Sequence, residues 1–359
     1  MTNTDASLDE AYLRLHHTGP EFGGDQKGDH GLANHGPMAA EVLVRRGHGE
    51  QVSSWLDRYV ARLIEMPTPR EPITERNMRD ALGGGRARLG DWTEYFTRQM
   101  AERPWREVLA EWWPVLLPGI TAGATHGAIR VGHAVRSLTG GAGELARFEL
   151  AHGLAFWAAR NRPIPGATVP SGLLSPGQAL AAVPHLTDQS GLIAHRLARL
   201  ADLPGWPAAQ AALRAPAEAD DVPVLLEELV QAATVRYLHR AHGSPILLVH
   251  TATAPNAVKH TLPVLPKEMW APSLAAVWSA TAAIVSAYEP GHTVPRTELP
   301  EAPRADDPVA DLLERAVANG DEHVIKFTDT AVEVYQASGD PDALAAAVRA
   351  RDLIAPEAS

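Results

Sequence analysis

The sequence predicts an all-α protein, a large multi-helix bundle with little or no sheet. Apolar residues recur at a spacing of three to four along most of the chain, which is typical of amphipathic helices. Strand signals are few. The best of them, the run 245–250, is too short to imply a sheet and could equally open a helix. We expect a single domain over residues 1–359, with 1–10 and 354–359 flexible.

Proline and glycine separate the expected helices. The first covers 38–65 with a break at Gly47–Gly49, and the second covers 91–117 with Pro104 at a helix start and Pro118-Gly119 at its end. Further helices are expected at 120–138, 143–161, 176–183, 189–202, 224–240, 271–288, 308–318, 320–337 and 341–353. No strand–helix alternation, GxGxxG motif or phosphate-binding loop is apparent.

Composition excludes several classes of site. The chain has no cysteine, so a transition metal would need imidazole, carboxylate or a modified side chain as ligand. A formal charge of −11 without a basic stripe argues against nucleic acid and anionic membranes as partners. No secretory signal is visible, and the apolar stretches fall short of the roughly 18 residues of a membrane span. The expected location is the cytoplasm. Sixteen histidines are the unusual feature, and several fall inside apolar helical patterns.

Three basic residues share one face of the helix expected at 120–138. His126, Arg130 and His133 stand at i, i+4 and i+7, among several glycines. Glycine lowers helix propensity, so such a helix usually lets another backbone or a ligand approach closely. The pattern predicts either a functional site or a tight helix crossing with a core histidine. Arg130 is a candidate for holding a phenolate or carboxylate.

His35 precedes a helix start at Gly36-Pro37. The helix dipole there favours neutral imidazole, the form that binds metal. The alternative is an exposed capping histidine.

A third segment, 321–329, places His323 and Lys326 on one face of an apolar helix, with Asp329 a turn further on. A buried lysine must be paired, depressed in pKa or modified, and neutral lysine can add carbon dioxide to give an anionic carbamate ligand. A surface ion pair of Lys326 with Asp329 is the alternative, and spacing alone favours it.

Two further histidines are weaker candidates. His250 ends an apolar run, and His152 lies in Glu149-Leu150-Ala151-His152-Gly153. No HExxH motif, facial-triad signature or GxSxG elbow is apparent.

Together these segments resemble the questin-oxidase-like family, oxygenases of aromatic polyketide metabolism. The resemblance covers about residues 10–350 and is carried by NHGPMAAE at 34–41, THGAIRVGHAVR at 125–136, ELAHGLAFWA at 149–158, the His250 segment and DEHVIKFTD at 321–329. It implies an all-helical fold and oxidative ring opening of anthraquinone-like substrates.

The resemblance also implies a non-haem iron site. By position it makes His35, His126, His250 and His323 candidate ligands, and Lys326 the candidate carbamate ligand. His133 and His152 stay in reserve as catalytic candidates beside Arg130. The implied partners are an aromatic small molecule and dioxygen, with NADPH as an external reductant for some members. Trp112, Trp113, Phe148, Phe156 and Trp157 are candidates for aromatic walls, although core packing is the simpler interpretation.

Two other functions remain open. One is a metal-free, NADPH-dependent Baeyer–Villiger monooxygenase, although the chain lacks a dinucleotide fingerprint. The other is a non-catalytic protein that binds an aromatic metabolite.

Overall fold

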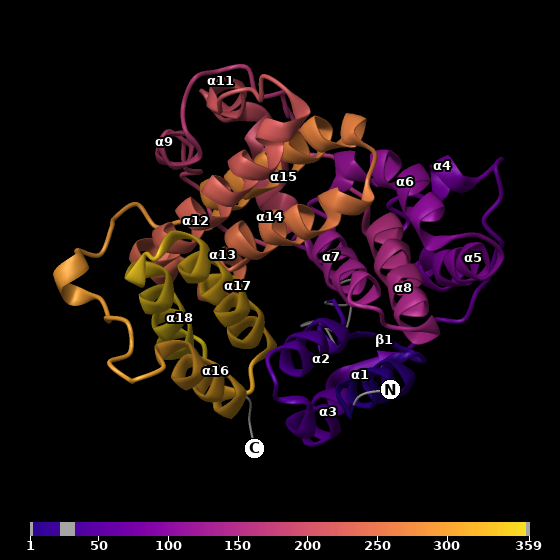
Figure 1. Cartoon of the computed structure of the whole chain (residues 1–359). Coiled ribbons are helices and arrows are strands. Elements are labelled where there is room, and N and C mark those ends of the chain that lie inside the picture. The colour runs from indigo at the N-terminus through magenta and orange to yellow at the C-terminus, as the bar shows by residue number, and fades with distance from the viewer. Residues whose placement is uncertain (1–2, 22–32, 357–359) are drawn as a thin grey trace. The chain divides into compact units, whose positions relative to one another are not determined.

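The computed structural model describes residues 3–21 and 33–356, and the structure is 69% helical with a sheet of only two strands, which confirms the predicted all-α class. The chain divides into two compact units: residues 1–163 with 263–266, and residues 164–262 with 267–358. Figure 1 shows the helices in chain order. The single-domain expectation stays a prediction.

The first unit holds a small sheet and the helices of the N-terminal part. Its elements are α1 Asn3–Leu15, β1 Thr18–Glu21, α2 Gly36–Arg45, α3 Val52–Tyr59, β2 Leu63–Glu65, α4 Met78–Ala81, α5 Leu89–Glu102, α6 Trp105–Leu116, α7 His126–Thr139 and α8 Glu144–Arg160. Strands β1 and β2 pair antiparallel, with Thr18 opposite Glu65 and Glu21 opposite Leu63. Neither the sheet nor α1, which begins inside the segment expected to be flexible, was apparent in the sequence pattern.

The second unit is helical. Its α-helices are α9 Pro176–Ala181, α10 Ile193–Ala198, α11 Trp206–Ala212, α12 Val222–Arg240, α13 Pro245–Leu248, α14 His250–Thr261, α15 Trp270–Tyr288, α16 Pro308–Asn319, α17 Glu322–Ser338 and α18 Pro341–Leu353. The apolar run at 245–250 therefore opens a helix. Asp307, Asp321 and Asp340 cap the last three helices, since their side chains accept hydrogen bonds from the first backbone N–H groups.

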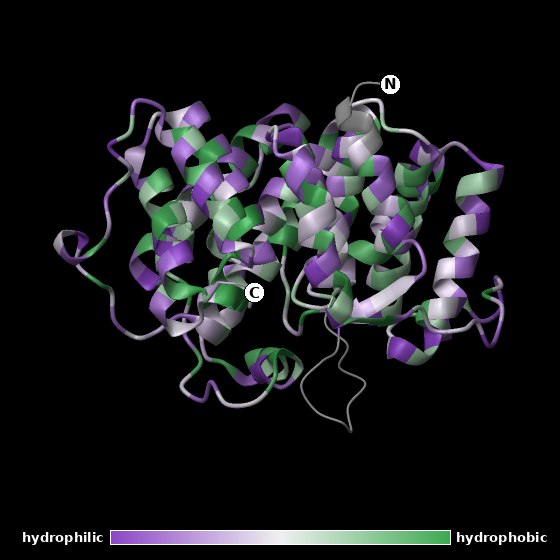
Figure 2. Ribbon diagram, turned by 90° about the horizontal axis from the view of Figure 1, so that it is seen from below, coloured by the Kyte–Doolittle hydropathy of each residue, from purple (hydrophilic) through white to green (hydrophobic). Residues whose placement is uncertain are grey.

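Amphipathic patterning explains most of these helices. In Figure 2, hydrophilic and hydrophobic residues alternate along most of them, which matches the spacing of three to four in the sequence. Helix α15 differs because almost its whole surface is apolar. Of the described helices, only the stretch Lys267–Tyr288, which contains α15, is long and apolar enough to cross a membrane, contrary to the expectation that no stretch would be. However, 67% of its apolar 18-residue window is buried inside the structure. A core helix has the same composition.

Helices α7 and α8 pack closely, and two glycines allow it. A Cβ on Gly127 would lie 2.6 Å from Cβ of Trp157, and a Cβ on Gly153 would lie 3.2 Å from Val131. Gly127 on α7 and Gly153 on α8 are thus explained by the close approach of the two helices. Trp113 stacks edge-on against Trp157 beside this crossing, and both indoles are fully buried in the core of the first unit.

Candidate metal centre

His35 lies at the start of α2, where the sequence predicted it. It is the N-cap residue, and its carbonyl oxygen accepts hydrogen bonds from the backbone N–H groups of Met38 and Ala39. The residue is only 2% exposed, so the alternative of an exposed capping histidine is wrong. Its backbone N–H donates to the hydroxyl of Tyr59 at 2.5 Å.

A buried carboxylate holds the His35 ring. Nδ1 of His35 lies 2.6 Å from Oε1 of Glu21, which the small sheet places beside α2. The same oxygen accepts a hydrogen bond from the Tyr59 hydroxyl, and Arg62 donates to Oε2 of Glu21 at 3.1 Å. A carboxylate bound to the outer nitrogen of an imidazole orients the ring and fixes its tautomer, as is common around metal-binding histidines.

His126 begins α7 rather than lying inside it. The sequence predicted a helix from 120, but Gly123, Ala124 and Thr125 have φ values of 51°, 57° and 71°. Left-handed backbone at Ala124 and Thr125 costs about 1 kcal/mol or more per residue, and such strain gathers at functional sites. This turn brings the carbonyl oxygen of Gly123 against Nδ1 of His126.

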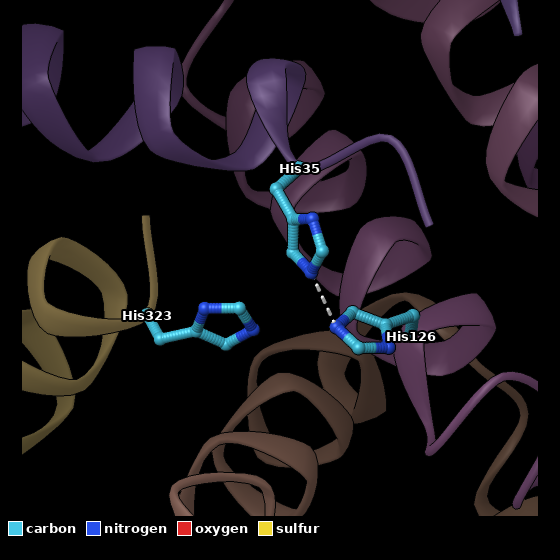
Figure 3. Close-up of side chains that lie close together, drawn as sticks. All are labelled: His35, His126 and His323. Atoms are coloured by element: carbon cyan, nitrogen blue, oxygen red, sulfur yellow. Dashed lines mark hydrogen bonds between the residues drawn. The ribbon is translucent and has the colours of Figure 1, made fainter. Parts of the chain in front are cut away.

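The two imidazoles present the same atom to each other. Nε2 of His35 lies 2.7 Å from Nε2 of His126, with the rings nearly perpendicular (Figure 3). The carbonyl of Gly123 can only accept, so Nδ1 of His126 carries its proton. The carboxylate of Glu21 likewise gives Nδ1 of His35 the role of donor. In the neutral rings, both Nε2 atoms are therefore acceptors with lone pairs directed at the same small region.

This donor arrangement fits a metal ion. Two facing lone pairs repel unless a proton or a cation lies between them. Adjacent imidazole nitrogens, each about 2.1 Å from an octahedral ion, are about 3 Å apart, close to the separation seen here. Neutral rings with protonated Nδ1 are also the form in which histidine binds metals through Nε2.

The second unit holds the other predicted histidines. His250 begins α14 and His323 lies in the first turn of α17, with ring centroids 5.6 Å apart at a near-perpendicular angle. Nδ1 of His250 lies 3.2 Å from the carbonyl oxygen of Leu247, and Nδ1 of His323 lies 3.3 Å from Oδ1 of Asp321. Both histidines are buried, so the structure brings these two sequence candidates together in one core.

Lys326 lies one turn after His323 on the same helix, and it is 3% exposed. Asp329 is 1% exposed. The alternative of a surface ion pair between them is therefore wrong, because neither side chain reaches the surface. Lys326 therefore lies in a packed helix, which is the environment that the sequence pattern predicted for it.

The carboxyl group of Asp321 lies beside the imidazole of His323 at the start of α17. Burial by itself would raise the pKa of Asp321, but His323 and the backbone N–H groups that Asp321 caps lower it below its usual value. The carboxylate therefore stays ionised next to the imidazole of His323.

Arg130 and His133 have other partners than the sequence interpretation gave them. Arg130 makes a two-pronged ion pair with Glu149 in the core, which joins α7 to α8, and its role in holding a substrate stays a prediction. Nδ1 of His133 lies 2.8 Å from Oε2 of Glu41, which Arg136 also contacts. Each basic group faces a buried carboxylate from another helix, which sequence spacing along one helix cannot show.

His152 is buried on α8 and stacks on His16, with ring centroids 5.1 Å apart. Burial, followed by the charge of Arg130, lowers its pKa well below the usual value. His152 is thus packed in the core against another imidazole, and its role as a catalytic candidate stays a prediction.

The aromatic residues named as walls belong mostly to the core. Trp112 packs against Trp92, Tyr95 and Phe96, and Trp113, Phe156 and Trp157 are buried as well. The core interpretation is the correct one for these side chains.

Sequence reasoning missed Glu21 and Tyr59. Both are made relevant by contacts with His35 across the fold, and neither lies in a recognisable motif. Glu21 is a single carboxylate at the end of a short strand, and the sequence gives no signal that it contacts His35 in the folded protein.

The fold and the site together define the class: an all-α protein with buried histidine pairs suited to a transition metal. No known protein-family model matches the chain, and no curated protein matches it either. The resemblance to questin-oxidase-like oxygenases thus rests on the segments of this sequence alone.

Proposed function

We propose that this protein is a metal-dependent oxidoreductase, a non-haem iron oxygenase, and that His35 and His126 are two of its metal ligands. The observation that carries the proposal is the 2.7 Å approach of two Nε2 atoms, both of them acceptors because Glu21 and Gly123 bind the opposite ring nitrogens. The reaction class and the aromatic polyketide substrate rest on the family resemblance.

Bound iron would supply dioxygen activation, a chemistry for which imidazole-rich sites with open positions are suited. The chain itself supplies orientation. Glu21 fixes the His35 ring, and the left-handed turn before α7 fixes that of His126. Rigid ligands of this kind favour one metal geometry over others.

The second donor set is His250, His323 and Lys326. All three residues are buried, which supports a functional role for them. A buried polar group needs a partner that compensates for the water it has lost. The resemblance makes these three residues candidate metal ligands as well.

Metal analysis of the whole chain tests the proposal. We expect near one iron per chain after purification or anaerobic ferrous loading, measured by plasma mass spectrometry with absorption and EPR spectra. The variant His126→Ala should lose the metal while retaining its helical circular dichroism. The exposed His195 on α10 offers a matched control, and His195→Ala should keep full metal content.

Full iron content in His126→Ala would overturn the ligand assignment. Absence of any metal after anaerobic loading would overturn the metal-dependent function and favour a metal-free monooxygenase or a binding protein. Oxygen uptake with polyphenolic compounds then separates an oxygenase from a protein that only binds metal.

A further inference from the structure

Four basic side chains gather at the end of α12 in the second unit. Arg240 ends that helix, His242 follows it, His292 lies after α15, and Arg349 is on α18. The rings of His242 and His292 are 4.5 Å apart between centroids. Both ring nitrogens of His242 and Nε of Arg349 are shielded from water and have no hydrogen-bond partner within the described residues.

The backbone around this basic cluster (Arg240, His242, His292, Arg349) is fixed. The backbone N–H of Val294 donates to the carbonyl of His239 at 3.1 Å, and Nδ1 of His239 lies 3.0 Å from the carbonyl of Val294. Arg240 donates to the carbonyl of Pro290 at 2.9 Å. Gly243 packs so closely that a Cβ there would lie 2.7 Å from Cδ of Pro290. The segment that carries His292 is thus held against α12 on both sides of that residue.

Within the described part of the chain, these charges have no carboxylate partner. Neither Arg240 nor Arg349 makes an ion pair there, although the chain carries a net charge of −11. Arg236, one turn before Arg240, shows the usual arrangement, a two-pronged pair with Glu289. Burial, then His292, Arg349 and Arg240 in that order, lower the pKa of His242, and no acidic group opposes them.

We propose that Arg240, His242, His292 and Arg349 form a binding site for a tetrahedral oxyanion, either inorganic phosphate or the phosphate group of a small molecule. Guanidinium groups and imidazolium N–H groups are the preferred donors to such oxygens. All four residues are partly or fully exposed, so a small anion can reach their outer atoms, while the shielded nitrogens of His242 and Arg349 have no competing partner within the described residues. The four residues are distinct from the proposed metal ligands.

The proposal predicts a direction with pH. A bound anion favours the protonated form of His242, so binding takes up a proton and strengthens as the pH falls. Sulfate is the suitable probe because its charge stays constant between pH 6 and pH 8, whereas that of phosphate changes.

Isothermal titration of the whole chain with sulfate, at constant ionic strength, tests the site. We expect saturable binding, tighter at pH 6 than at pH 8, and at least tenfold weaker binding in Arg349→Gln. Arg351 lies two residues further on α18 and pairs with Asp352, so Arg351→Gln is a matched control and should bind as the parent does. The exposed His292 provides a second variant, His292→Asn, which should weaken binding without affecting folding.

No saturable sulfate binding, or equal binding by the parent and by both Arg349→Gln and His292→Asn, would overturn the proposal. Parallel titrations with inorganic phosphate and with glycerol phosphate identify the source. Tighter binding of the monoester assigns the site to a phosphorylated small molecule, and equal binding assigns it to the inorganic anion.

Discussion

The buried ion pair between Arg130 and Glu149 makes a sharp prediction about stability. The two side chains are 4% and 6% exposed, and Nη2 of Arg130 lies 2.7 Å from Oε2 of Glu149. Burial raises the pKa of Glu149, and Arg130 offsets this only in part. The ionised pair is thus tolerated in the core because each partner compensates the other.

Replacing Arg130 by Met leaves a buried carboxylate without its cation. Breaking such a pair costs about 3–5 kcal/mol. The double variant Arg130→Met with Glu149→Met removes both charges and should return to within about 2 kcal/mol of the parent, since apolar replacement of a buried pair is often neutral.

The sign of the pH dependence follows from the raised pKa. A carboxyl whose folded pKa lies above its unfolded value destabilises the protein as the pH rises between the two. Without Arg130 that gap widens, so the loss in Arg130→Met should grow from pH 5 to pH 7, by up to about 1.4 kcal/mol per pH unit. At pH 5 the protonated carboxyl escapes most of the penalty.

Urea unfolding followed by tryptophan fluorescence at the two pH values measures these differences. Arg147 pairs with Glu144 at 3.7 Å on the exposed side of α8, and Arg147→Met should cost less than about 1 kcal/mol at either pH. A decrease of less than about 1 kcal/mol in the free energy of unfolding of Arg130→Met at pH 7, or an equal decrease at both pH values, would contradict this prediction. Removing the partner of a buried carboxylate must destabilise the protein more than breaking an exposed ion pair does.

Two more predictions concern the same unit. Gly127→Ala should destabilise the protein by about 1–3 kcal/mol, because the new methyl group would lie 2.6 Å from Cβ of Trp157. The control Gly177→Ala, whose new methyl group would have no neighbour nearer than 3.7 Å, should be neutral or mildly stabilising. Equal shifts in the melting temperature of the two variants would contradict the close helix contact. Burial by itself would raise the pKa of Glu41, but Arg136 and His133 together lower it well below its usual value. Glu41 therefore contributes stability above its unfolded pKa of about 4.3 and loses that contribution on acidification. Glu41→Gln should be less stable than the parent at pH 7, with the difference in the free energy of unfolding closing towards pH 3, and a constant difference would be inconsistent with the depressed pKa.

The amino-acid pattern was enough to predict the fold class and most helix positions. Both depend on local physics: the spacing of apolar residues, and the Asp caps at 307, 321 and 340 that satisfy the first backbone N–H groups. It also selected the histidines on packed helices, because an imidazole inside an apolar pattern needs a partner. His35, His126, His250 and His323 are all buried.

The partners of the polar side chains became known only from the tertiary structure. His35 and His126 are 91 residues apart, and Glu21, which contacts His35, lies on a strand that the sequence pattern did not predict. Arg130, which spacing placed on a face with His126, turned instead to Glu149. Helical periodicity tells which face of one element is apolar, whereas a hydrogen bond needs two atoms within about 3 Å, and that distance is fixed by the packing of elements far apart in the chain.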